Sequence, residues 1–156
     1  MAWASYSRRN GDANAVRPHI PPELRRQVAK DGGYRCGYCL TSQRIIGRPM
    51  AIDHILPISK GGTSPRDNLW LSCRRCNEFK GSQTHAIDPL TDERTPLLNP
   101  RVNSWNAHFA WDESGARIIG LSAIGQVTVL ALHLNNDEIV TARHLWIQSG
   151  WHPPIK

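Results

Sequence analysis

The stretch Ile52–Lys80, IDHILPISKGGTSPRDNLWLSCRRCNEFK, contains the residues that decide how this chain of 156 residues folds. It begins with an apolar run that carries Asp53 and His54, turns at residues 60–62, and ends with the pair Cys73 and Cys76. An ionised aspartate inside an apolar strand costs several kcal/mol unless it is paired or binds a cation. The stretch therefore predicts a functional site at the end of a strand.

The four cysteines of the chain form two C-x2-C pairs, Cys36 with Cys39 and Cys73 with Cys76. Each pair brings two thiolates together on a tight turn, and two pairs complete a tetrahedral site for zinc. Disulfides and unrelated free thiols are the alternatives, but disulfides do not persist in a reducing cytosol. We favour a structural Zn²⁺, which in a closed four-cysteine site holds the fold and takes no part in chemistry.

Charge is distributed unevenly along the chain, whose net charge is +6. Residues 1–82 carry 14 Lys and Arg against 6 Asp and Glu, a net of +8, whereas residues 83–156 carry 5 against 7, a net of −2. A positive first half suits a protein that binds a phosphate backbone, although a contribution to solubility explains it equally well.

The composition also bears on where the protein works. No long uncharged apolar run is present, which excludes a membrane-spanning helix. The arginines near the N-terminus are not followed by an apolar segment, which argues against a secretory signal. We therefore expect a cytoplasmic protein.

Three parts are expected along the chain. Residues 1–19 are polar and rich in arginine, which is typical of a flexible basic arm. Residues 20–83 contain both cysteine pairs and form the expected core, and residues 84–156 form an extension packed on it. The elements that we predict in the core are a helix at 22–31, strands at 50–56 and 69–71, and a helix at 74–83.

The extension is expected to combine a hairpin with helices. Residues 84–104 are rich in Pro, Thr and Asp and indicate a linker or a wrapped loop. Residues 108–111 and 117–121 predict a hairpin. Residues 127–134 fit a strand and a helix equally well, and we favour a helix because Asn135 and Glu138 resemble a capping box for a following helix that ends at Gly150.

The stretch carries the side chains that phosphodiester hydrolysis requires. His54 titrates near neutral pH and is suited to take a proton from water. Asp53 and Asn77 offer hard oxygen ligands, and an incomplete oxygen-rich set suits Mg²⁺ or Mn²⁺. The sequence therefore predicts a second, catalytic metal site beside the zinc site.

This pattern, over about residues 34–82, closely resembles the HNH endonucleases of the ββα-metal group. The residues that carry the resemblance are Asp53, His54, Asn68, Asn77 and Lys80, framed by the two cysteine pairs. An asparagine, Asn77, stands at the last position of the motif, a variant familiar in the family, and the extension is similar to one found in small bacterial HNH proteins. The resemblance implies an α+β fold with a ββα-metal, treble-clef-like nuclease core stapled by the zinc site, and a C-terminal hairpin and helical extension.

The resemblance also implies a role for each residue of the motif. It implies a metal-dependent endonuclease in which His54 is the general base, Asp53 and Asn77 bind a single divalent ion, and Asn68 braces the loop between the two strands. The alternative is a non-catalytic, zinc-dependent module that binds nucleic acid or docks on a protein. The presence of Asp53, His54 and Asn77 together favours the enzyme, because a mere binding module has no reason to keep all three.

Double-stranded DNA is the partner that we expect. The residues predicted to contact it are Lys60, Arg74, Arg75 and Lys80, all of which are ordinary exposed residues in the plainer interpretation. No recognition helix is apparent in the sequence, so we expect binding led by the DNA backbone, with sequence preference supplied by a protein partner.

Overall fold

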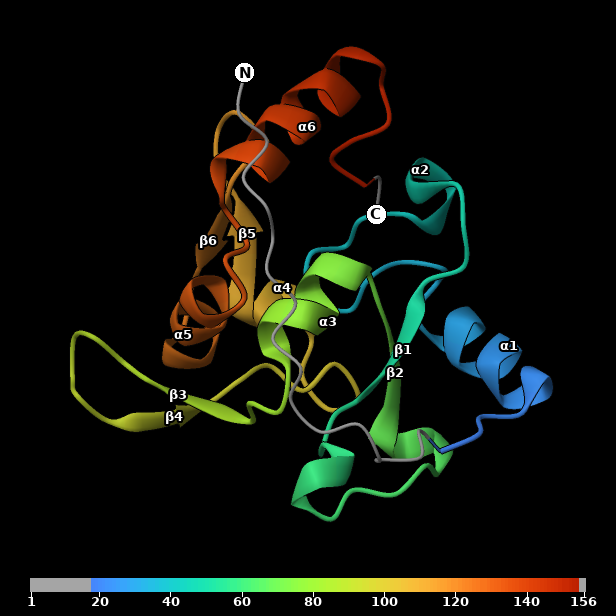
Figure 1. The fold of residues 1–156 in the computed structure, drawn as a ribbon. Helices are drawn as coiled ribbons and strands as arrows, with labels where there is room; N and C mark the ends of the chain where they lie inside the picture. The colour runs from blue at the N-terminus through green and yellow to red at the C-terminus, as the bar shows by residue number, and fades with distance from the viewer. Residues whose placement is uncertain (1–17, 155–156) are drawn as a thin grey trace, which may run out of the picture.

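The computed structural model describes residues 18–154, so the basic arm predicted at residues 1–19 lies almost entirely outside the described residues. Figure 1 shows a mixture of helices and small sheets. The helices are α1 (Pro22–Asp31), α2 (Gln43–Ile46), α3 (Arg74–Lys80), α4 (Trp105–His108), α5 (Ala123–Ala131) and α6 (Asp137–Gln148), with 3-10 turns η1 (Ile58–Lys60) and η2 (Arg66–Asn68). The strands are β1 (Ala51–His54), β2 (Leu69–Ser72), β3 (His85–Ile87), β4 (Arg94–Pro96), β5 (Phe109–Trp111) and β6 (Ile118–Gly120).

Strands β1 and β2 form an antiparallel pair that leads directly into α3, which gives the order strand, strand, helix. Asp53 faces Trp70 and His54 faces Leu69 across the pair. Strand β1 is shorter than the predicted 50–56, because after His54 the chain bends into the loop that leads to β2. The strand pair thus presents Asp53 and His54 at the edge of that loop.

Helix α1 confirms the prediction for residues 22–31. Pro22 occupies the first helical position, where no backbone donor is needed. Val28 on its inner face packs in a small apolar cluster with Ile20 and Leu69. The helix therefore covers β2, on the right of the strand pair in Figure 1.

The extension packs on the same hydrophobic core as the cysteine pairs. One cluster of buried side chains joins the cysteines to the extension, and includes Cys36, Cys39, Cys73, Cys76, Leu97, Leu98, Phe109, Ile118, Val127, Leu132 and Leu134. Trp105 Nε1 also donates a hydrogen bond of 2.9 Å to the carbonyl of Tyr38, between the first two cysteines. The extension thereby packs against the part of the chain that contains the cysteines. The domain boundaries stay predictions.

Residues 84–104 contain a hairpin where the sequence indicated a linker or a wrapped loop. Strands β3 and β4 pair antiparallel, with Ala86 facing Thr95. Each strand has only three residues, which is too short for alternation of apolar and polar residues to be recognised in the sequence. The hairpin at residues 108–121 was predicted and is confirmed by the pairing of β5 with β6.

Helix α5 confirms that residues 127–131 are helical, but the helix begins at Ala123 and ends at Ala131, so both ends lie earlier than the predicted 127–134. The Ser122 hydroxyl accepts a hydrogen bond from the Gly125 backbone at 3.1 Å. A serine cap in this place satisfies a free N–H of the first turn and so fixes where the helix begins.

The N-cap of α6 is Asn136 and not Asn135. The Asn135 side chain instead binds both backbone groups of Ile118, at 2.7 and 2.8 Å. It therefore extends the edge of β6, a role that depends on a partner distant in sequence. Within residues 18–154, no helix has the length and apolarity needed to cross a membrane.

Candidate functional site

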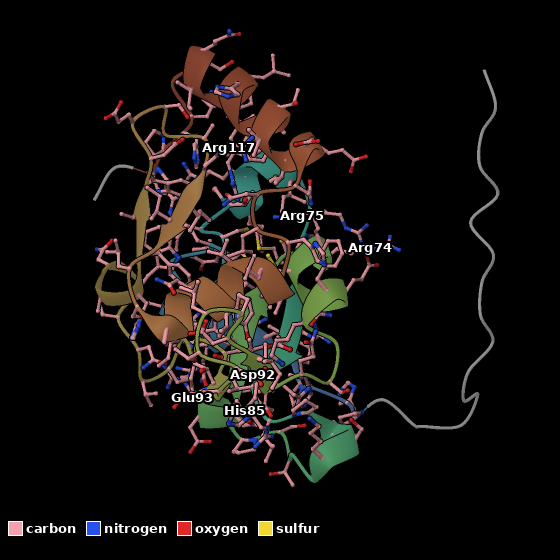
Figure 2. The ribbon with its side chains drawn as sticks, turned by 90° about the vertical axis from the view of Figure 1, so that its left-hand side faces the viewer. Arg74, Arg75, His85, Asp92, Glu93 and Arg117 are labelled. Carbon is pink, nitrogen blue, oxygen red and sulfur yellow. The ribbon has the colours of Figure 1, made fainter. Side chains whose placement is uncertain are left out.

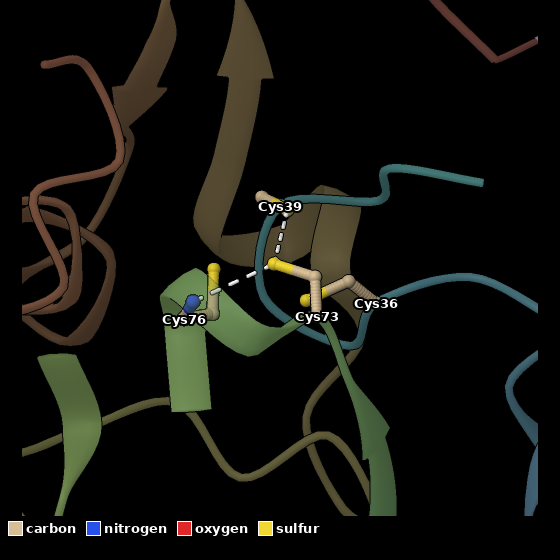
Figure 3. A group of neighbouring side chains, drawn as sticks. All are labelled: Cys36, Cys39, Cys73 and Cys76. Atoms are coloured by element: carbon tan, nitrogen blue, oxygen red, sulfur yellow. Dashed lines mark hydrogen bonds between the residues drawn. The ribbon is translucent and has the colours of Figure 1, made fainter. Parts of the chain in front are cut away.

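The four cysteines converge at one point from two separate segments (Figure 3). Their sulfur atoms all lie within 4.8 Å of one another, and all four are buried free thiols. The Sγ atoms of Cys39 and Cys73 are 3.8 Å apart. This is the edge of about 3.8 Å expected for a tetrahedron with Zn–S bonds of about 2.3 Å. The cluster therefore fits a metal ion, and thiolate donors favour zinc.

Close packing ties the cysteine cluster to the strand pair. A Cβ at Gly37 would lie 2.1 Å from Cδ1 of Trp70, so only glycine fits at position 37, next to Cys36. Trp70 in turn faces Asp53 across the strand pair. At the other cysteine pair, Cys76 lies in the first turn of α3 and is followed directly by Asn77. The cluster thus fixes the position of both strand and helix.

A cleft of about 380 Å³ lies beside β1 and α3. Asp53, His54 and Asn77, the three residues expected to share the chemistry, all line it. The other lining residues are Pro18, Ile20, Arg25, Ala51, Ile52, Pro57, Ile58 and Gly81. The fold therefore brings the three residues from a strand and a helix to one opening, where hard oxygen ligands lie near an imidazole.

His54 is half-buried at the end of β1. Its Nε2 lies 2.9 Å from the hydroxyl of Ser64, which fixes the orientation of the ring. Burial lowers the pKa of His54 below its ordinary value; Asp53 raises it in part, and Lys80 lowers it further. The lowered pKa favours the uncharged imidazole at neutral pH, which is the form that accepts a proton.

Asp53 is buried and holds two hydrogen bonds from the protein. The Tyr38 hydroxyl donates to Oδ2 at 2.7 Å, and Lys80 Nζ donates to Oδ1 at 3.1 Å. Burial raises the pKa of Asp53, while the charge of Lys80 and the hydrogen bond from Tyr38 lower it. Removing the charge of Lys80 would leave a buried carboxylate without its partner, at a cost of about 3–5 kcal/mol.

Asn68 closes the loop that follows β1. Its Oδ1 accepts from the Leu56 backbone at 2.8 Å, and its Nδ2 donates to the carbonyls of Leu56 and Thr63 at 3.0 and 2.7 Å. The loop also requires Gly62, because a Cβ there would lie 1.8 Å from the carbonyl oxygen of Leu56. These contacts hold the loop that carries Ser64, the partner of His54.

The basic residues predicted to contact nucleic acid differ in their surroundings. Lys60 and Arg74 are exposed, and Arg74 forms an ion pair of 2.6 Å with Glu78 on the same helix. Arg75 is half-buried and donates from Nη1 to the carbonyl of His133 at 2.9 Å. Figure 2 accordingly shows Arg74 at the edge of the molecule and Arg75 turned further inward. Lys60 and Arg74 are therefore the more accessible of these three.

Lys80 does not lie where the sequence led us to expect it. Only 2% of the residue is exposed, and its Nζ also donates to the carbonyl of His54 at 3.0 Å. It lines a separate cavity of about 190 Å³ and not the cleft that Asp53 lines. The reason is that α3 ends at this residue and packs on β1, where the buried Asp53 carboxylate supplies an opposite charge.

Three residues at the site were not predicted from the sequence: Tyr38, Ser64 and Arg25. A buried tyrosine hydroxyl usually finds a hydrogen-bond partner, but the sequence around Tyr38 does not show that its ring is buried. Ser64 resembles an ordinary polar residue of a loop. Arg25 of α1 lines the cleft but had no signal, because it is one of several exposed arginines.

Comparison with known proteins gives two findings. The family model for the HNH endonuclease matches residues 36–83. Septu protein PtuB of Bacillus thuringiensis is 29% identical to this chain over 130 residues, which is 80% of this chain and 46% of that protein. The chain thus spans about half the length of this curated relative, and no solved structure matches it. The matched region begins at the first cysteine and contains the strand pair, all of α3, and Asp53, His54 and Asn77. The segment of residues 36–83 is therefore similar to the HNH endonuclease domain.

Proposed function

We propose that the protein is a metal-dependent endonuclease that hydrolyses phosphodiester bonds of double-stranded DNA. The observation that carries the proposal is the shared cleft, where Asp53, His54 and Asn77 meet within the segment that matches the family. A scaffold retained only for binding would not need a carboxylate, an imidazole and an amide at the same opening.

In this proposal Asp53 and Asn77 hold one divalent ion. A carboxylate oxygen and an amide oxygen are hard ligands, which suit Mg²⁺ or Mn²⁺. Within residues 18–154 the Asn77 side chain makes no hydrogen bond, so its oxygen is free to face the cleft. When bound, such an ion stabilises negative charge on the phosphate and on the leaving oxygen.

His54 acts as the general base. Its uncharged imidazole takes a proton from the attacking water, and Ser64 keeps the ring in place during the transfer. Asn68 acts through the loop: its three hydrogen bonds keep Ser64 and η1 in a fixed position relative to β1. Asn68 is therefore a positioning residue and does not touch the substrate.

In this proposal exposed basic residues hold the DNA backbone. Arg25 lines the cleft itself, and Lys60 and Arg74 are exposed on η1 and α3. Arginine suits phosphate because its planar fork donates two parallel hydrogen bonds. Contacts of this kind carry no sequence information, so a protein partner would supply the sequence preference.

The four cysteines bind a structural zinc ion and take no part in the reaction. The zinc ion, β1, β2 and α3 together make a treble-clef-like ββα-metal core, to which the extension is attached. This division gives each metal a separate task.

The test is cleavage of supercoiled plasmid by the zinc-loaded protein with added Mg²⁺ or Mn²⁺. We expect nicked or linear DNA from the wild type and intact DNA from His54→Ala. His144→Ala, which alters an exposed histidine outside the cleft, is the matched control and should cleave normally.

A gel-shift measurement with the same plasmid separates the proposal from its alternative. If the wild type shifts the plasmid but leaves it intact with every divalent ion, the protein is a binding module. Chelators are avoided in this test, because they also remove the structural zinc.

A further inference from the structure

Two buried donors hold the Asp53 carboxylate without entering the cleft. Tyr38 and Lys80 are 0% and 2% exposed, and they bind different oxygens of Asp53. Among the described residues, the lining of the cleft includes Asp53 but neither of these donors. They therefore approach the carboxylate away from the opening and are not placed to touch a substrate there.

The two hydrogen bonds leave the carboxylate able to bind a cation. A carboxylate offers about four lone-pair positions, of which Tyr38 and Lys80 use two. With one donor on each oxygen, the plane of the Asp53 carboxylate cannot rotate, so the remaining lone pairs keep a fixed direction. Preorganised ligands of this kind bind a metal ion more tightly than ligands that rotate freely.

The two donors have different tasks. Lys80 supplies the opposite charge that a buried carboxylate requires, and it also holds the His54 carbonyl. The Tyr38 hydroxyl is uncharged, so charge balance does not explain it. A phenol is protonated at neutral pH, so this hydroxyl donates to the Asp53 carboxylate.

Tyr38 is itself held at both ends. Its backbone lies between Cys36 and Cys39, and its carbonyl accepts the hydrogen bond from Trp105 of the extension. Its hydroxyl reaches Asp53 at 2.7 Å. The turn at Cys36–Cys39 is here called the first zinc knuckle. The Tyr38 side chain thus runs from this knuckle to the carboxylate, so a displacement of the knuckle would move the donor of Asp53.

We propose that Tyr38 is a positioning residue that orients the Asp53 carboxylate for the divalent cation, so that the zinc knuckle sets the geometry of the cation site. This inference rests on the proposed function, in which Asp53 is a ligand of that ion. It assigns to the first knuckle a second task besides holding the fold.

The test is Mn²⁺ binding by the zinc-loaded protein in the absence of DNA, measured from the electron paramagnetic resonance signal of free Mn²⁺. Tyr38→Phe removes only the hydroxyl and keeps the buried ring. We expect it to bind Mn²⁺ about tenfold more weakly than the wild type, the lower end of the effect of removing an outer hydrogen-bond partner of a metal ligand. Zinc content and melting temperature are measured on the same samples and should stay close to those of the wild type.

Tyr34→Phe is the matched control, because Tyr34 is 50% exposed and makes no contact with Asp53. It should bind Mn²⁺ as the wild type does. Equal binding by Tyr38→Phe and the wild type would overturn the inference. Loss of zinc or of cooperative melting in Tyr38→Phe would overturn it too, since the hydroxyl would then be a structural group only.

Plasmid cleavage separates this inference from the proposed function. If the wild type cleaves DNA and Tyr38→Phe binds Mn²⁺ normally, the inference fails and the function stands. If the wild type binds Mn²⁺ and Tyr38→Phe binds it weakly, but neither cleaves, the function fails and the inference stands. A wild type that binds no Mn²⁺ contradicts the inference, and it contradicts the function as well if the protein cleaves with neither Mg²⁺ nor Mn²⁺.

Discussion

The cysteine cluster and the cleft differ in what surrounds their polar atoms. The four sulfur atoms lie within 4.8 Å of one another in the hydrophobic core. Asp53, His54 and Asn77 instead line an opening of about 380 Å³. A closed set of four donors leaves no position for water or substrate, whereas the cleft leaves room for both. The contrast supports the proposal that the first group provides stability and the second chemistry.

The two groups are nevertheless joined by short stretches of chain. Asn77 follows Cys76 directly, and Tyr38 lies between Cys36 and Cys39 while its hydroxyl binds Asp53. A change at the cluster should therefore disturb the cleft, while a change on the open side of the cleft should leave the cluster intact. This asymmetry can be tested with single substitutions.

The largest effect is expected for Cys73→Ser. The substitution leaves three thiols at the site in the core, one fewer than a four-cysteine zinc site requires. Structural zinc contributes about 10–16 kcal/mol of binding free energy in small zinc domains, which is comparable with the whole stability of a domain. We expect loss of bound zinc and of helical circular dichroism. A Cys73→Ser protein that keeps its zinc and melts cooperatively would contradict the assignment of stability to the cluster.

His54→Ala should lose cleavage activity but keep its fold and its zinc. Loss of a general base lowers the rate by about 10²–10⁴-fold. The side chain is half-buried and lines the cleft, so zinc content and circular dichroism should remain those of the wild type. Plasmid cleavage and a zinc assay on one preparation measure both properties, with His144→Ala as control. An unfolded His54→Ala would remove the distinction between the two groups.

Local patterns in the sequence predicted most of what the two groups contain. The spacing of Cys36, Cys39, Cys73 and Cys76 predicted their convergence, because a C-x2-C turn is set by neighbouring residues. Helix α1 was predicted to the residue for a similar reason, since a proline begins it and glycines follow it. The sharing of one cleft by Asp53, His54 and Asn77 came from the resemblance, which carries long-range information.

The contacts that could not be predicted join residues distant in sequence. The pair of Lys80 with Asp53 depends on the way α3 packs on β1, and the bond from Tyr38 depends on where the knuckle lies. A lysine at the end of a short helix is usually exposed, so sequence alone favours the surface. The structure shows that Lys80 instead pairs with the buried carboxylate of Asp53.

A smaller effect is expected for Asn68→Ala, which tests the open side of the cleft. The substitution removes three hydrogen bonds that hold the loop, worth about 1–3 kcal/mol together because water can reach the freed groups. Melting temperature should fall by several degrees at unchanged zinc content, and cleavage should fall because Ser64 no longer steadies His54. Asn106→Ala, at an exposed asparagine of α4, is the control. Loss of zinc from Asn68→Ala would show that the loop and the cluster are not separable.

The smallest effect is expected at Asp31, which lies outside the cysteine cluster and the cleft. Its carboxylate joins the core to the extension. Arg66 and Arg101 donate to its carboxylate at 2.5 and 2.8 Å, and a hydrogen bond from Arg66 is the main cause that lowers the pKa of Asp31 to about 2. A depressed pKa stabilises the folded state above the ordinary pKa of about 4, and this contribution is lost as the pH falls toward 2. Solvent screening limits this contribution to about 1 kcal/mol.

Asp31→Asn should therefore melt at a lower temperature than the wild type at pH 6, and this gap in melting temperature should close near pH 2. Asp67→Asn, an exposed neighbour of Arg66, is the control, and a gap that stays constant with pH would show that Asp31 acts by packing and not by charge.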